Sequence, residues 1–165
     1  MRIIKLAIIS FVFFFLLITG ISLFFPAHIR ISRAIDINAN KDSVLGQIND
    51  ATKWKNWYPG ADSLDFLYIN GIIKGIRTDS LQGVMIQQVN DSAVLANHVG
   101  LNSGKSETGW NIFTTSIPNT VTVQWFMDFH LKWYPWEKFS SMLLENRYGP
   151  MLEQGLAKLK KVVEK

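Results

Sequence analysis

The sequence predicts an α+β domain in which a curved antiparallel sheet wraps around one long C-terminal helix, with a single membrane-spanning helix in front of it. Three observations lead to this interpretation. Residues 6–25 are apolar and uncharged, alternating apolar and polar residues follow up to residue 131, and apolar residues at helical spacing close the chain. A run of strands cannot bury its apolar face alone, and the long helix is the predicted element large enough to cover it.

The composition excludes several classes of protein. The 165 residues, 48% hydrophobic and 18% charged, have the length of one domain and are neither disordered nor a coiled coil. Cysteine is absent, which excludes disulfides, cysteine-ligated zinc, iron–sulfur clusters and thiol catalysis. Three histidines argue against a multi-histidine metal site, so we expect no metal and no cofactor. The net charge of +4 comes without a recognisable nucleic-acid-binding module, so we expect no nucleic-acid partner.

Residues 6–25 form the predicted transmembrane helix. At about 1.5 Å per residue, twenty helical residues span the ~30 Å hydrocarbon layer of a bilayer. A cleaved signal peptide is the alternative, but its apolar stretch would be shorter and would end at small residues. This stretch ends in Leu23, Phe24 and Phe25, directly before Pro26. We therefore favour an anchor that stays on the protein.

The anchor sets the predicted domain boundaries and the orientation. Arg2 and Lys5 make the N-terminal tail basic, and basic tails stay inside. The domain is therefore expected outside the membrane. The predicted segments are a tail at 1–5, the transmembrane helix at 6–25, a short linker at 26–28 and the domain at 29–165.

The first strand of the domain is predicted at residues 29–38, where isoleucines alternate with polar residues. Asn40 can cap a short helix over 41–49, and a second helical turn can run over 52–57 and end before Pro59. Six more strands follow, at 64–69, 72–78, 83–89, 93–99, 108–117 and 120–131. Turns are predicted at Asn70-Gly71, Asn90-Asp91 and Pro118-Asn119, with a polar loop at 102–105.

The last element is a helix predicted at residues 139–164. Apolar residues recur at helical spacing in this segment, and lysines crowd its last turns, where they suit the helix dipole. Pro150 is expected to kink the helix or to mark a break after Gly149. Gly155 is expected to be a position of close packing.

Two segments resemble a known family. The first has the spacing Ile35, Ile37, Ala39, Val44, Ile48, Asp50, Trp54, Trp57, Pro59, and the second is the sequence from Gly155 to Lys160. Together they resemble the polyketide cyclase/dehydrase-like branch of the START-related SRPBCC superfamily. The resemblance implies the helix-grip fold and an apolar cavity between sheet and long helix, suited to lipids, sterols or polyketides. Short anchors occur among its bacterial members, which implies a bacterial inner membrane with the domain on the periplasmic side.

The branch shares no catalytic residues that could be carried over, so the cavity candidates come from the pattern. Alternate residues of the last strand share one face, and residues three apart on a helix share another. A filled core would use the same residues, and Trp57 could instead pin the short helices together with Trp54. The cavity candidates are Trp57, Trp125, Met127, Phe129, Tyr148 and Met151.

Two further groups of polar or aromatic residues were considered. His98, Asp128 and His130 are acid–base candidates on strands, but we expect a solvated outer face for them, since proton transfer on a ligand requires a place inside the cavity. A second group is rich in aromatic residues and lysine, which favour the lipid headgroup region. It could instead fold back over the sheet. The membrane-interface candidates are Lys132, Trp133, Tyr134, Trp136 and Lys138.

These observations predict a membrane-anchored protein that binds a hydrophobic small molecule or lipid in a cavity between the sheet and the C-terminal helix. The sequence contains no recognisable catalytic constellation, and we identify no catalytic residue. One alternative is a cyclase- or dehydratase-like enzyme acting on such a ligand. Another is a structural or partner-binding module with a filled core.

Overall fold

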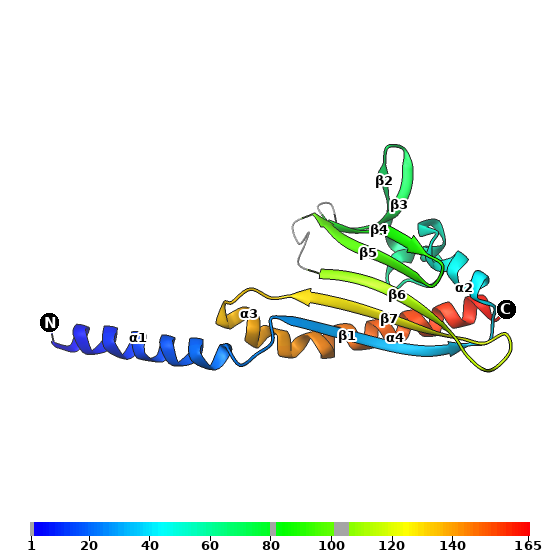
Figure 1. The fold of residues 1–165 in the computed structure, drawn as a ribbon. Helices are drawn as coiled ribbons and strands as arrows, with labels where there is room; N and C mark the ends of the chain where they lie inside the picture. Colours follow the sequence, from blue (N-terminus) through cyan, green and yellow to red (C-terminus); the bar gives the residue numbers. More distant parts are fainter. Residues whose placement is uncertain (1, 80–81, 101–105) are drawn as a thin grey trace.

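The computed structural model describes residues 2–79, 82–100 and 106–165, and the predicted polar loop at 102–105 lies outside these residues. A single antiparallel sheet dominates the domain, with the strand order β1-β7-β6-β5-β4-β3-β2 (Figure 1). The strands are β1 (His28–Ile37), β2 (Asp65–Ile69), β3 (Ile72–Asp79), β4 (Gln82–Asn90), β5 (Ala93–Gly100), β6 (Ser106–Thr114) and β7 (Val121–His130). The first strand, β1, therefore forms one edge of the sheet, and the last strand, β7, returns to pair with it.

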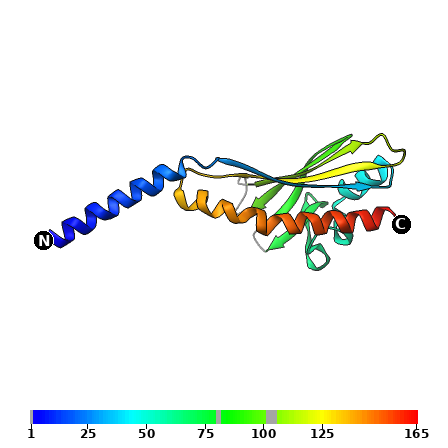
Figure 2. The same ribbon diagram turned by 90° about the horizontal axis from the view of Figure 1, so that it is seen from below.

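Helices occupy one face of the sheet and the two ends of the chain. The N-terminal helix α1 (Arg2–Ser22) projects away from the domain (Figures 1 and 2). Short helices α2 (Lys41–Ile48), η1 (Ala51–Asn56) and η2 (Ala61–Ser63) follow β1, and α3 (Pro135–Ser140), η3 (Ser141–Leu143) and α4 (Leu144–Val163) follow β7. Figure 2 shows α4 running along the sheet beside β1. This curved sheet around a C-terminal helix confirms the predicted helix-grip fold.

Helix α1 is long and apolar enough to cross a membrane by length and composition, and none of its apolar stretch is buried by the rest of the protein. It begins at Arg2, so it includes most of the predicted tail, and it ends at Ser22 instead of residue 25. Phe25 closes a turn by donating its backbone N–H to the Ser22 carbonyl at 3.2 Å. The chain then passes into β1 within three residues.

Local capping explains where the short helices begin. The side chain of Asn40 accepts a hydrogen bond from the Ser43 N–H at 2.7 Å, as predicted for a helix cap. Asp50 caps η1 in the same way through the Thr52 N–H. At the tip of the β2–β3 hairpin, Asn70 and Gly71 have φ angles of 52° and 78°, which is the backbone that a two-residue hairpin turn requires.

Several predictions for the second half of the chain also differ from the structure. β6 ends at Thr114 instead of residue 117, because the Thr115 hydroxyl binds backbone groups of the turn, including the Thr120 carbonyl at 2.9 Å. The C-terminal helix is divided, since η3 separates α3 from α4. Pro150 neither ends nor breaks α4, which continues from Leu144 to Val163. Packing of the turns on both sides against the sheet outweighs the hydrogen bond that the proline cannot donate.

Candidate functional site

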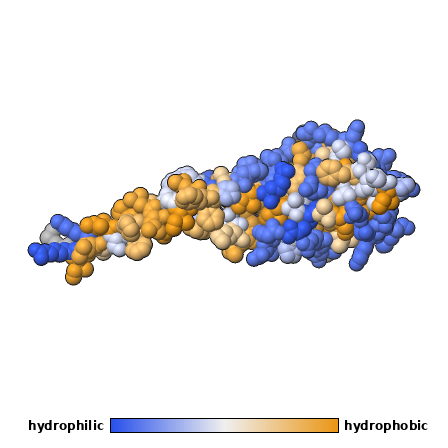
Figure 3. Space-filling model, turned by 60° about the horizontal axis from the view of Figure 1, so that its bottom comes forward, coloured by the Kyte–Doolittle hydropathy of each residue, from blue (hydrophilic) through white to orange (hydrophobic). Residues whose placement is uncertain are grey.

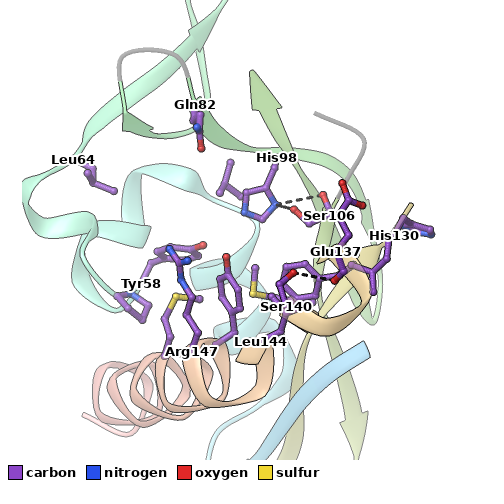
Figure 4. Close-up of a pocket in the computed structure, with 17 residues that line it drawn as sticks. Tyr58, Leu64, Gln82, His98, Ser106, His130, Glu137, Ser140, Leu144 and Arg147 are labelled. Atoms are coloured by element: carbon purple, nitrogen blue, oxygen red, sulfur yellow. Dashed lines mark hydrogen bonds between the residues drawn. The ribbon is translucent and has the colours of Figure 1, made fainter. Parts of the chain in front are cut away.

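A partly open pocket of about 520 Å³ lies between the inner face of the sheet and the start of α4 (Figure 4). Its floor comes from the ends of β4 to β7, and its opposite wall comes from α4. Its sides come from the chain after η1 and from α3. This volume lies within the range of about 300–1,000 Å³ that is usual for small-molecule sites.

Four of the six cavity candidates lie at this pocket. Met127 and Phe129 reach it from β7, and Tyr148 and Met151 reach it from the facing side of α4. The rings of Phe129 and Tyr148 touch across the pocket wall, with their centroids 5.0 Å apart. The two-residue alternation of the strand and the three-residue spacing on the helix bring these four side chains to the same space.

The other two candidates, Trp57 and Trp125, lie outside the pocket lining. Both side chains are fully buried, with ring centroids 5.9 Å apart, in an aromatic cluster with Trp54, Tyr58 and Trp110. The Trp125 indole donates to the Thr108 hydroxyl at 2.8 Å, and the Trp57 indole donates to the Gln47 carbonyl at 3.2 Å. The space between sheet and helix is thus solid on the side of this cluster and hollow on the side of Met127.

Gly155 explains why the solid part is so tightly packed. A Cβ atom at this position of α4 would lie 2.2 Å from Cζ3 of Trp125 and 3.0 Å from Cδ of Pro59. The absence of a side chain therefore lets the helix approach the aromatic cluster. This placement agrees with the expectation that Gly155 is a packing position.

A histidine and a serine supply polar atoms inside the pocket. Nδ1 of His98 on β5 lies 3.1 Å from the Ser106 hydroxyl and 3.4 Å from the Ser106 carbonyl. Burial lowers the pKa of His98, and the backbone of Ser106 partly opposes this shift, so the imidazole is neutral at physiological pH. Figure 4 shows the other ring nitrogen pointing toward the pocket interior.

The expectation of a solvated outer face is wrong for His98, and a signal in the sequence could have corrected it. Val94 and Ala96 are completely buried on the inner face of β5, and His98 continues their alternation. The polar character of histidine hides its place in this pattern. Tyr58 is a further pocket residue that the sequence pattern does not predict. Its phenol is buried, and burial raises its pKa. The neighbouring Tyr148 adds a smaller shift in the same direction, so the phenol is neutral.

Charged side chains stand at the rim of the pocket. Arg147 is exposed, and its guanidinium carbon lies 5.5 Å from the Tyr148 ring centroid. Glu137 accepts a hydrogen bond from the Lys132 N–H at 2.7 Å. His130 lies at the end of β7, where its ring stacks on His28. The pocket thus combines an apolar interior, one internal polar pair and a charged rim, which suits a molecule with an apolar body and a polar group.

Asp128 lies on the opposite face of the sheet from the pocket. It is buried, however, because Arg30 covers it with two hydrogen bonds of 2.8 and 2.6 Å and His28 approaches to 3.3 Å. The Arg30 guanidinium also lies 4.4 Å above the Phe126 ring. Arg30 holds the pKa of Asp128 below its usual value. Asp128 is therefore an ion-pair partner and takes no part in the pocket.

The membrane-interface candidates fall into two groups. The rings of Trp133, Tyr134 and Trp136 stack on one another instead of folding over the sheet, and both tryptophans are about 60% exposed. Lys132 is exposed as well. Lys138, in contrast, is buried and donates to the carbonyl of Phe25 at 3.0 Å, so it connects α3 to the end of α1.

The sequence matches no protein-family model and no curated protein. Solved structures, however, share its fold. A START superfamily protein from Mycobacterium smegmatis matches with a TM-score of 0.59 at 17% identity, covering 82% of this chain and 97% of that chain. The Zhui aromatase/cyclase from Streptomyces sp. R1128 matches with a TM-score of 0.59 at 13% identity, covering 83% of this chain and 94% of that chain. Norcoclaurine synthase from Thalictrum flavum matches with a TM-score of 0.60 at 13% identity, covering 82% of this chain and 94% of that chain.

These identities establish the fold and leave the activity open. The neighbours carry the same curved sheet and C-terminal helix over nearly their whole length. The resemblance found in the sequence therefore holds at the level of architecture: this chain has the START-like helix-grip fold, preceded by one apolar N-terminal helix.

Proposed function

We propose that this chain is a membrane-anchored protein that binds a hydrophobic small molecule or lipid in the pocket between the sheet and α4. The observation that carries the proposal is the pocket itself, in which apolar side chains such as Met127, Phe129, Leu144 and Met151 surround a hollow of about 520 Å³. Burial of an apolar body in such a space is favourable, and the few polar groups orient the ligand.

The fold neighbours support a small-molecule role. One is an aromatase/cyclase and another is a synthase in complex with a transition-state analogue, so this architecture accommodates small organic molecules in other proteins. The present pocket lies between the sheet and the C-terminal helix of this architecture.

Contacts at the end of α1 support an anchor that remains on the protein. Phe25 packs its ring edge-on against Phe139 at 5.3 Å, and its carbonyl accepts the hydrogen bond from Lys138. Cleavage of α1 as a signal peptide near this point would remove part of the packing of α3. We therefore infer a single-pass protein whose exposed Trp133 and Trp136 lie in the headgroup region.

Native mass spectrometry of the full chain, released from detergent micelles, tests the proposal. We expect a co-purified apolar molecule. Met151→Trp fills the pocket and should remove this adduct, whereas Met142→Trp makes the same change at an exposed site and should retain it. Absence of any adduct, together with no uptake of a fluorescent fatty-acid analogue, would refute ligand binding and favour the filled-core alternative.

A cyclase- or dehydratase-like enzyme is the second candidate, because His98 and Ser106 form a polar pair inside the pocket. A neutral imidazole can act as a general base. Among the described residues, however, His98 makes its hydrogen bonds to Ser106 and none to a carboxylate that would orient it, which favours binding over catalysis. If the protein is an enzyme, His98→Gln should change the chemical identity of the co-purified molecule, since unreacted substrate accumulates. A binding protein should retain the same molecule.

A further inference from the structure

The segment from Pro135 to Leu143, which comprises α3 and η3, has two different sides. Glu137 and Ser140 line the pocket. Three apolar residues of the same segment, Trp136, Met142 and Leu143, are instead 62–66% exposed. One short stretch of chain is therefore both a wall of the pocket and an apolar outer surface.

This segment is held against the end of α1. The buried ammonium group of Lys138 donates to the Phe25 carbonyl at 3.0 Å, and Phe139 packs on the ring of Phe25. The two elements also follow each other on the surface, since Leu23 and Phe24 at the end of α1 are strongly exposed. Figure 3 shows the hydrophobic surface of α1 continuing onto the adjoining end of the domain, whereas the far end is mostly hydrophilic.

The length of α1 sets the height of this segment relative to a bilayer. Twenty-one helical residues extend about 31 Å, which is close to the thickness of the hydrocarbon layer. If α1 spans the membrane, its Ser22 end lies at the membrane surface, and the segment packed on that end lies there too. Exposed apolar side chains next to polar ones are typical of elements that sit in the interface.

The segment is also built from short elements. α3 has six residues and η3 has three, and helices of this length have little stability of their own. Tyr134, at the N-terminus of α3, makes no capping side-chain hydrogen bond within the described part of the chain. Such a segment belongs to the part of a fold that can open locally while the sheet stays intact.

We propose that the pocket exchanges its ligand directly with the bilayer across the segment 135–143, and that this ligand is an acyl-chain lipid of the membrane in which α1 is anchored. This inference rests on the proposed function, because it requires a pocket that binds. It adds the source of the ligand and the route. The apolar chain passes from the bilayer along the outer side of the segment into the space beside Met127 and Met151, while the polar group stays at the rim near Arg147.

Photocrosslinking in vesicles tests this route. The full chain is reconstituted in vesicles of phosphatidylcholine and phosphatidylglycerol that contain a trace of phosphatidylcholine with a diazirine in its acyl chain. After illumination, crosslinked peptides are identified by mass spectrometry. We expect crosslinks on the peptides that carry Met127 and Met151. Met142→Asp places a charge on the outer side without touching the pocket and should lower these crosslinks several-fold.

The matched control is Val89→Asp, which changes an exposed apolar residue at the β4–β5 hairpin, far from α1, and should leave the crosslinks unchanged. Equal pocket crosslinking in both variants would overturn the route through this segment. If the purified chain takes up a fluorescent fatty-acid analogue but the vesicle lipid never reaches the pocket, the bilayer source is wrong and the proposed function stands. If neither ligand binds, the proposed function itself fails.

Discussion

At the residue scale, the ion pair between Asp128 and Arg30 is the clearest source of pH-dependent stability. Arg30 lowers the pKa of Asp128 below its ordinary value of 3.8, chiefly through the hydrogen bond. A carboxyl group whose folded pKa is lowered stabilises the fold above its unfolded pKa, and this contribution is lost as the pH falls through the folded value. The pair should therefore contribute at neutral pH and cease to contribute in acid.

We expect Asp128→Asn to lower the free energy of unfolding at pH 7, because charge-assisted hydrogen bonds are lost. Since half of the Arg30 side chain already faces solvent, the loss should be limited to about 1–3 kcal/mol. The difference from the unmodified chain should shrink below about pH 4. Chemical denaturation of the full chain in detergent at several pH values measures this. Asp65→Asn, at an exposed carboxylate, is the control. A difference that stays constant down to pH 2 would contradict the assignment.

The hollow beside Met127 leads to a second prediction at this scale. In a solid core, Met→Ala or Leu→Ala costs about 2–5 kcal/mol. Since Met127 borders empty space, its change to Ala should cost about 2 kcal/mol or less. Leu152→Ala changes a fully buried position away from the pocket lining, and its loss of stability should be higher in that range. Equal losses for the two variants in the same denaturation experiment would mean that the space beside Met127 is filled.

The placement of single residues was predictable where it depends on alternation and unpredictable where it depends on volume. Alternation alone put Met127 and Phe129 on the inner face of β7. It could not separate them from Trp125, which shares that face but packs into the aromatic cluster. Whether two facing surfaces leave a hollow depends on the summed sizes of side chains from distant parts of the chain, and no local pattern records that sum.

At the element scale, the approach of α4 to the sheet depends on Gly155. Helix propensity alone would make Gly→Ala stabilising by about 1 kcal/mol. Here the added Cβ would meet the ring of Trp125, which its neighbours hold in place. We therefore expect Gly155→Ala to lower the melting temperature, with an overpacking cost of about 1–3 kcal/mol.

Gly46 in α2 provides the matched control, because nothing lies within 4 Å of a Cβ at that position. Gly46→Ala should raise the melting temperature by the ordinary gain in helix propensity, about 0.5–1 kcal/mol. A parallel rise for Gly155→Ala would show that α4 does not depend on this close approach.

The order of the elements was predictable, whereas the division of the last helix was not. The sequence around Ser140 and Ser141 contains no residue that forbids a helix, so one helix from residue 139 was the natural interpretation. In the structure the two hydroxyls donate back to the carbonyls of Glu137 and Lys138, and the chain tightens into η3 directly afterwards. Such side-chain bonds become visible only once the backbone is known.

At the scale of the whole molecule, orientation in the membrane is the main prediction. Arg2 and Lys5 lie at the N-terminal end of α1, and such basic ends remain on the cytoplasmic side. A reporter enzyme that is active only in the cytoplasm, fused after Lys165, should therefore be inactive, while the same reporter fused before Met1 should be active. Strong activity of the C-terminal fusion would reverse the orientation.

The whole architecture was predictable because strand periodicity, short helices and a long final helix allow few arrangements that bury every apolar face. The way in which α1 meets the domain was beyond prediction. Lys138 was expected to face lipid, yet it is buried against the Phe25 carbonyl, because a contact between residues 113 positions apart has no local signature.

The short junction between α1 and β1 has a consequence for how the protein would sample its ligand. Ala27 accepts a hydrogen bond from the Leu131 N–H at 2.7 Å, so the domain is fixed to α1 with almost no free chain between them. If α1 spans a bilayer as proposed, a pocket held in this way meets that bilayer at a constant effective concentration. Its occupancy would follow the mole fraction of the lipid in that membrane, and diluting the vesicles would leave it unchanged.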